Sequence, residues 1–151
     1  MGIARVGRPP VLVMETGLNA VAGGDVPGWV SGSPANLAAS GNFSAVFDLG
    51  PDWDQYSVLY LAILPQAPSS GLASVLATGS DTPSPNLNRR LQVVGATTVG
   101  SLFAASLLSA NGAQGAFVRP MGRYVAVNGT NADASNALGA GAKVTLAAYP
   151  G

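Results

Sequence analysis

The sequence is poor in charge and contains no cysteine or histidine. Charged residues make up 9% of its 151 residues, against about 25% in an average globular domain. Without cysteine there is no disulfide bond and no thiolate metal site, and without histidine the commonest general base and metal ligand are missing. We therefore predict that the chain is not an enzyme and holds no cofactor or metal. Its stability must then come from packing and association.

The few charges balance, because seven basic residues face seven acidic ones. A neutral chain has no long-range attraction for nucleic acid or for an anionic membrane, so we expect neither as a partner. Lys143 is the only lysine and Glu15 the only glutamate, and protein interfaces are likewise depleted of these two residue types while they retain arginine. The composition predicts a surface that is largely covered by protein neighbours.

No long hydrophobic run is present near the N-terminus. The first apolar segment, Val11–Met14, spans four residues between Pro9-Pro10 and Glu15. A membrane helix needs about 20 apolar residues, and the apolar region of a signal peptide needs about 7–15. Residues 1–10 have no apolar period and include Arg5 and Arg8, so we expect an extended arm there. The remaining residues 11–151 suffice for one hydrophobic core but not for two ordinary domains.

The clearest strand signals lie between residues 42 and 64. In Asn42–Leu49 one set of residues alternates with another at the two-residue period of a half-buried strand: Phe43, Ala45, Phe47 and Leu49 with Ser44, Val46 and Asp48. Tyr56–Leu64 is rich in aromatic and branched residues and is apolar on both faces, which is typical of a central strand. Gly50 and Pro51 separate the two segments, and Pro65 ends the second.

Shorter segments predict the remaining strands. Asn111-Gly112 is the favoured dipeptide of a tight hairpin turn and predicts a local hairpin between the strands on either side of it. Gly79–Asn86 and Asn128–Asn136 are polar and are expected to be loops. The further strands are expected at Leu72–Ala77, Leu87–Val94, Thr97–Leu108, Ala116–Arg119, Arg123–Asn128 and Lys143–Tyr149. With about eight strands and no convincing helix, the pattern predicts an all-β fold, a single β-sandwich or jelly roll of antiparallel strands.

Two groups of side chains are candidates for binding. Asp48, Asp52 and Asp54 are close enough in sequence to meet one calcium ion, but they lack the spacing of a calcium loop and are better explained as acids at a strand end. Trp29 and Trp53, with Tyr56, are suited to stacking on a sugar, although aromatic residues of this kind are more often buried in a core or an interface.

The arginines are candidates for contacts between subunits. Arg89 and Arg90 are adjacent in an expected strand, so their side chains are predicted to lie on opposite faces. Arg119 and Arg123 flank the turn at residues 120–122. Four arginines are too few for a strong phosphate footprint, so we interpret them as ion-pairing residues between subunits.

The segments NFSAVFDLG (residues 42–50), YSVLYLAIL (56–64) and GRYVAVN (122–128) resemble small virion proteins of tailed bacteriophages. In particular, they are similar to jelly-roll cement or decoration proteins that clamp neighbouring major capsid subunits. The resemblance implies a homodimer or homotrimer on the outside of the capsid, with the major capsid protein as its partner and an extended terminal arm that reaches a neighbour. It implies a virion location after synthesis in the bacterial cytoplasm, and it assigns no catalytic residue.

We accordingly predict a phage structural protein that stabilises the head shell. The alternatives left open are a tail, neck or fibre component on the same sandwich, and a carbohydrate-binding module. The candidate interface residues are Arg5, Arg8, Pro9, Pro10, Trp29, Trp53, Arg89, Arg90, Arg119 and Arg123.

Overall fold

The structure, a computed structural model, describes residues 11–17, 19–21, 39–65, 69–82, 89–94, 107–109, 114–139 and 141–151. Over these ranges the regular structure is almost entirely β-strand, with one short 3-10 helix, η2 (Trp53–Gln55). The strands are β1 (Leu12–Gly17), β2 (Asn19–Val21), β3 (Asn42–Asp48), β4 (Tyr56–Leu64), β5 (Gly71–Ser80), β6 (Leu107–Ser109), β7 (Gln114–Val118), β8 (Tyr124–Asn131) and β9 (Lys143–Pro150).

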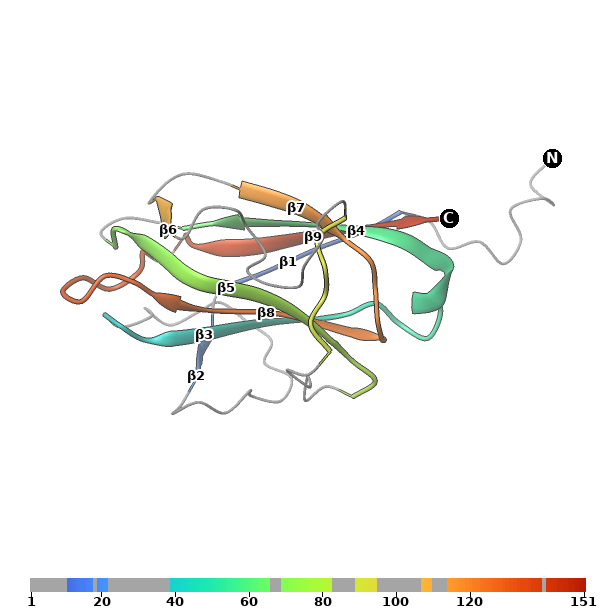
Figure 1. Cartoon of the computed structure of the whole chain (residues 1–151), viewed down its shortest axis with the longest axis horizontal. Helices are drawn as coiled ribbons and strands as arrows, with labels where there is room; N and C mark the ends of the chain where they lie inside the picture. The colour runs from blue at the N-terminus through green and yellow to red at the C-terminus, as the bar shows by residue number, and fades with distance from the viewer. Residues whose placement is uncertain are drawn as a thin grey trace.

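The strands form two layers, a β-sandwich (Figure 1). Sheet A has the strand order β1-β9-β4-β7, and sheet B has the order β2-β3-β8-β5-β6. Every pairing between named strands is antiparallel. The all-β sandwich that the sequence predicts is therefore confirmed.

The core lies between the two sheets, because alternate side chains of each strand point inward. Both sheets contribute, and fully burying one large apolar side chain stabilises the fold by about 1.5–3 kcal/mol. The largest fully buried side chains are Phe43, Leu59, Leu61, Ile63, Leu72, Leu146, Val118, Val125 and Val127.

One side of the sandwich is joined by the first two strands. β1 pairs with β9 in sheet A and β2 pairs with β3 in sheet B, yet a single residue separates β1 from β2 in the sequence. Strands that change sheets in this way form the corners of β-sandwiches. The N-terminal part of the domain therefore ties the edge of one sheet to the edge of the other.

The opposite side is joined by residues 89–94, the yellow segment that crosses between the layers in Figure 1. The Leu91 amide donates to the Ala77 carbonyl of β5 at 2.8 Å, and the Val94 amide donates to the Phe117 carbonyl of β7, also at 2.8 Å. The segment therefore leaves sheet B and reaches sheet A within three residues. The single strand expected over Leu87–Val94 is wrong for its described part, which forms isolated bridges only.

The hairpin predicted around Asn111-Gly112 is also wrong. The strand before this dipeptide, β6, pairs with β5 in sheet B, while the strand after it, β7, pairs with β4 in sheet A. The two strands flank a crossing between sheets and are not hydrogen-bonded to each other. The dipeptide itself, and most of the strand expected over Thr97–Leu108, lie outside the described residues.

The expected boundaries hold best for β4, β3 and β9, and β9 ends one residue after the expected Tyr149. β4 has the predicted bounds, and β3 ends one residue before the expected Leu49. The two expected polar loops begin inside strands, because β5 continues to Ser80 and β8 continues to Asn131. The Asn131 side chain, at the end of β8, accepts a buried hydrogen bond at its Oδ1 atom from the Ser69 hydroxyl at 2.6 Å.

Candidate assembly surface

The outer face of sheet A carries a row of apolar side chains that crosses every strand of the sheet. Val13 of β1 pairs with Ala147 of β9, Ala147 pairs with Tyr60 of β4, and Tyr60 pairs with Phe117 of β7. The hydrogen bond from the Val94 amide to the Phe117 carbonyl adds a fifth member. Directly paired residues point to the same face, so the outer row consists of Val13, Ala147, Tyr60, Phe117 and Val94.

Three of the five members of this row are exposed to solvent, and Ala147 and Tyr60 are partly buried. Val13 is 71% exposed, Phe117 48% and Val94 45%. A second row beside it contains Tyr149, which is 39% exposed and pairs with Val58. Val11, also exposed, precedes β1 where the register continues toward Tyr149. Exposed apolar residues scattered singly are normal, but a contiguous group of them marks an interaction surface.

Tyr60 keeps this face flat. Its ring lies 4.8 Å from that of Phe117, with the ring planes inclined at 49°, an arrangement worth about 0.5–1.5 kcal/mol beyond burial. The ring also covers Gly115, since a Cβ atom built on that glycine would overlap the Tyr60 hydroxyl. The absence of a side chain at residue 115 therefore lets the tyrosine lie along the sheet.

Charge is confined to one end of the same face. The four strands of sheet A contain only two charged residues, Glu15 and Lys143, whose side chains form an ion pair at 3.1 Å. Both are about half exposed, and an ion pair of this kind contributes little to stability. The outer face of sheet A is accordingly an apolar surface without net charge.

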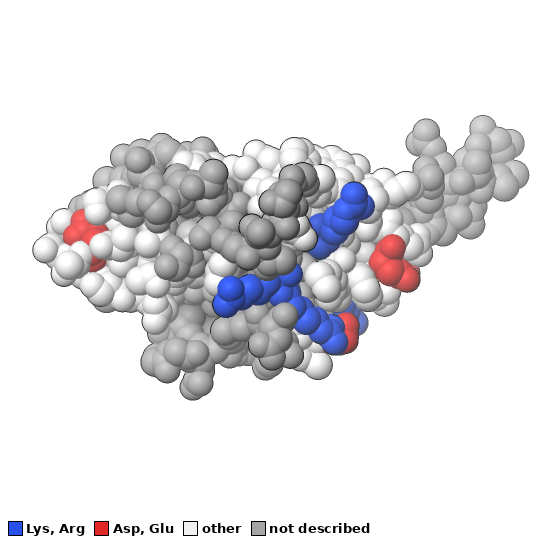
Figure 2. Space-filling view, viewed as in Figure 1, with Lys and Arg blue, Asp and Glu red and all other residues white. Residues whose placement is uncertain are grey.

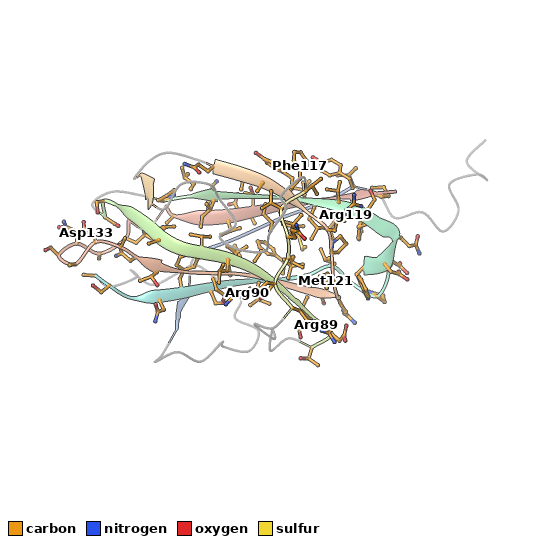
Figure 3. All side chains as sticks on the ribbon, viewed as in Figure 1. Arg89, Arg90, Phe117, Arg119, Met121 and Asp133 are labelled. Carbon is orange, nitrogen blue, oxygen red and sulfur yellow. The ribbon has the colours of Figure 1, made fainter. Side chains whose placement is uncertain are left out.

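The arginines gather on the side of the molecule closed by residues 89–94. Figure 3 labels Arg89, Arg90 and Arg119 around this segment, with Met121 between them, and Figure 2 shows the corresponding blue patch near the middle of this side. Arg89 is paired with Asp81 at 2.8 Å. Arg90 and Arg119 are exposed and form none of the ion pairs found among the described residues. We call this group of three arginines the arginine edge.

Arg123 has an internal role. Its Nε atom donates to Asp48 Oδ1 at 2.7 Å and its Nη2 atom to Asp48 Oδ2 at 2.9 Å, which joins the start of β8 to the end of β3. The hydrogen bond from Arg123 lowers the pKa of Asp48, and a hydrogen bond from the Gly50 amide lowers it further, while burial acts in the opposite direction. The Asp48 carboxylate and the Arg123 guanidinium therefore pair with each other within one chain and help to hold β3 and β8 together.

The described aromatic candidates for sugar binding are packed inward. Tyr56 is 6% exposed and belongs to the core, and Trp53 is partly buried against that core. Asp52 and Asp54 are exposed on either side of Trp53, and the described part of the chain brings together no group of acidic side chains that could hold a metal ion. The remaining candidates, Arg5, Arg8, Pro9, Pro10 and Trp29, lie outside the described residues.

Asp133 organises a loop at the far end of the sandwich, labelled in Figure 3. Its carboxylate accepts hydrogen bonds from the Ser70, Ser135 and Asn136 amides and from the Asn136 side chain. These four donors lower the pKa of Asp133 well below its ordinary value, the Ser135 amide most of all. The sequence predicted only a polar loop here. The sequence does contain a signal for this loop structure. An aspartate two residues before Ser135 and three before Asn136 favours a turn in which its side chain accepts hydrogen bonds from the backbone amides that follow it.

Comparison of the sequence with family models found no match, and comparison with curated proteins found no significant similarity. Among the described residues, no helix is both long and apolar enough to cross a membrane. The two surfaces, the apolar outer face of sheet A and the arginine edge, are the structural features that bear on function.

Proposed function

We propose that this chain is a structural protein of a bacteriophage virion, a cement or decoration protein that binds major capsid subunits on the outside of the head and stabilises the shell. The observation that carries the proposal is the apolar outer face of sheet A, which has no net charge and is suited to burial within an assembly. A surface of this composition acts by being buried against other protein. The proposal includes no catalytic step, no cofactor, and no nucleic-acid or membrane partner.

We further propose that the sandwich is a jelly roll. The chain changes sheets between β3 and β4, between β4 and β5, and again at each connection from β6 to β9. Strand orders in which most consecutive strands lie in opposite sheets are typical of the two Greek keys of a jelly roll. This supports the resemblance of the strand sequences to phage decoration proteins, from which the virion assignment comes.

The proposed mechanism is burial of area across subunit boundaries. Each square ångström of apolar surface removed from water contributes about 25 cal/mol, so a modest contact gives modest affinity by itself. On a symmetric shell the same contact recurs many times, and linked contacts add strength through high local concentration. A protein of this kind needs exposed apolar area and few charges, which are the two properties that the chain has.

Co-sedimentation with expanded capsids tests the proposal. The full chain is expected to pellet with the shells in a saturable manner and to remain in the supernatant without them. Loss of residues 1–10 should weaken the binding if the arm is a tether, and an unchanged affinity would refute that role. A full chain that never pellets with capsids would refute the proposed function itself.

A tail, neck or fibre component on the same sandwich remains the alternative within the virion. It predicts binding to purified tails and none to heads, so the same sedimentation assay separates the two locations. The carbohydrate-binding alternative has less support, because Tyr56 is buried and Trp53 is packed against the core. Glycan-array binding that disappears in Trp53→Ala would nevertheless favour it over a purely structural role.

A further inference from the structure

We propose that the outer face of sheet A is the contact surface between two copies of this chain, related by a two-fold axis, with their A sheets packed face to face. The inference rests on the proposed function only in taking this face to be buried in an assembly. It adds the occupant, a second copy, and leaves the arginine edge for a different partner.

The distribution of charge favours a second copy on this face. In a two-fold contact each patch meets itself, so a patch with a net charge repels its own copy. The strands of sheet A carry only Glu15 and Lys143, which neutralise each other at 3.1 Å. The formal net charge of the whole chain is also zero, so no long-range repulsion opposes the approach of two copies.

The arginine edge has the opposite property. Arg90 and Arg119 are exposed and take part in no ion pair among the described residues. A two-fold contact centred there would bring like charges together, whereas an acidic surface on another protein would complement them. The two surfaces are thus suited to different neighbours, the apolar face to a second copy and the arginine edge to a protein of opposite charge.

The relief of the face suits packing between sheets. Packed sheets lie about 10 Å apart, and the side chains of the two facing surfaces interdigitate between them. Ala147, Ala62 and Gly115 are small, and Tyr60 lies across Gly115 and against Phe117. Two such faces can approach with their strands aligned, as in other sandwiches.

The size of the face sets the strength of the contact. Four strands about 4.8 Å apart and about seven residues long, at about 3.4 Å per residue, cover roughly 450 Å² in each copy. The total of about 900 Å² is below the range of about 1,200–2,000 Å² found in stable complexes. The dimer is therefore weak and reversible in solution, and it becomes well populated where a shell holds two copies close together.

Sedimentation equilibrium of the full chain over a wide concentration range tests the inference. The wild type is expected to pass from monomer to dimer as its concentration rises. Val13→Lys and Phe117→Lys lie on the two edge strands of sheet A, β1 and β7. Each would bury a cation in the apolar contact, and each should weaken dimerisation by about tenfold or more. Met121→Lys is the matched control. Met121 is 49% exposed, close to the 48% of Phe117, but Met121 lies outside sheet A whereas Phe117 belongs to β7. Its dimerisation should equal that of the wild type.

Several results would overturn the inference. A wild type that stays monomeric at every concentration, or that forms trimers, excludes the two-fold contact. If Val13→Lys disrupts the dimer and Phe117→Lys does not, the copies pair through the edge of β1 and not through the face. Circular dichroism confirms that each variant is folded, and Val94→Lys replaces Phe117→Lys if the latter is not.

The outcome is separable from that of the proposed function. A monomeric chain that still pellets with capsids refutes the two-fold contact and leaves the cement function standing. A dimer that is lost in both lysine variants but that never binds capsids supports the contact and refutes the function.

Discussion

Gly115→Ala should separate the stability of the fold from its capacity to associate. A Cβ atom at residue 115 would overlap the Tyr60 hydroxyl and lie 2.7 Å from Tyr60 Cε2. These atoms are at the far end of a side chain, so the ring can lift away from the sheet without moving the backbone. Tyr60 would then leave its position beside Phe117 and project from the outer face.

The expected change in the free energy of unfolding is small because two effects oppose each other. Loss of the contact between Tyr60 and Phe117 costs about 0.5–1.5 kcal/mol. Replacing a glycine inside a strand with alanine stabilises the fold by about 0.5–1 kcal/mol, since the unfolded chain loses freedom. The net change should lie within about 1 kcal/mol, which for a domain of this size shifts the melting temperature by about 2–4 °C at most.

The association of Gly115→Ala should fall much further than its stability. A projecting tyrosine prevents two A sheets from reaching the separation of about 10 Å that face-to-face packing requires. Thermal unfolding and sedimentation equilibrium on the same sample measure the two quantities. A variant that dimerises like the wild type, or one that loses several kcal/mol of stability, would refute this account of Tyr60.

The remaining predictions concern the fold. Gly122→Ala should lower the free energy of unfolding by about 3 kcal/mol or more in a denaturant titration, because Gly122 has a φ of +147° and a Cβ atom there would lie 2.6 Å from the Ser80 carbonyl oxygen. Gly50→Ala should lower it by only about 1–2 kcal/mol, because Gly50 has a φ of +84° but a Cβ atom there would have nothing within 4 Å. Equal losses in the two variants would contradict the overlap at Gly122. Asp48→Asn should destabilise the fold at neutral pH by removing the carboxylate that pairs with Arg123. The folded-state pKa of Asp48 is lowered, so its contribution is complete above the unfolded value of about 3.9 and is lost as the pH falls through the folded value. The stability gap between the variant and the wild type should therefore close in acid, and a gap that is constant with pH would exclude the ion pair as its cause.

The strands that stay within one sheet along their whole length could be predicted from the sequence. In β3 the two-residue period of Phe43, Ala45 and Phe47 predicts the strand, but the half-buried strand that it indicates is wrong, because Ser44 and Val46 on the other face are buried as well. In β4 the branched and aromatic residues predict a central strand, and β4 does lie between β9 and β7. Local side-chain pattern determines these features, so one sequence suffices.

The connections between sheets could not be predicted in the same way. Leu91 and Val93 are two residues apart and both pack toward the core, as in a continuous strand, although one pairs with sheet B and the other with sheet A. Likewise, a turn dipeptide favours a tight turn but does not specify which sheet the next strand joins. The partner of a strand depends on residues distant in the sequence, which the local pattern does not contain.

The assembly surface can be predicted from the sequence only in part. Low charge predicts covered surfaces, and the arginine edge contains three of the candidate arginines. The outer row does not follow from the sequence, because apolar residues on both faces of Tyr56–Leu64 indicate burial on both sides, whereas Tyr60 faces outward and is only partly buried. The outer row becomes apparent only when several strands are compared, because Val13 and Tyr149, like Tyr60, alternate with inward-facing residues.

Calorimetry of expanded capsids titrated with the purified chain tests the central claim most directly. A ligand that binds the intact shell and not its dissociated subunits raises the temperature at which the shell comes apart, by an amount that grows with the logarithm of the free ligand concentration above its dissociation constant. A cement protein is therefore expected to raise the shell transition progressively as its concentration exceeds that constant. A shell that comes apart at the same temperature with and without saturating protein would contradict the account.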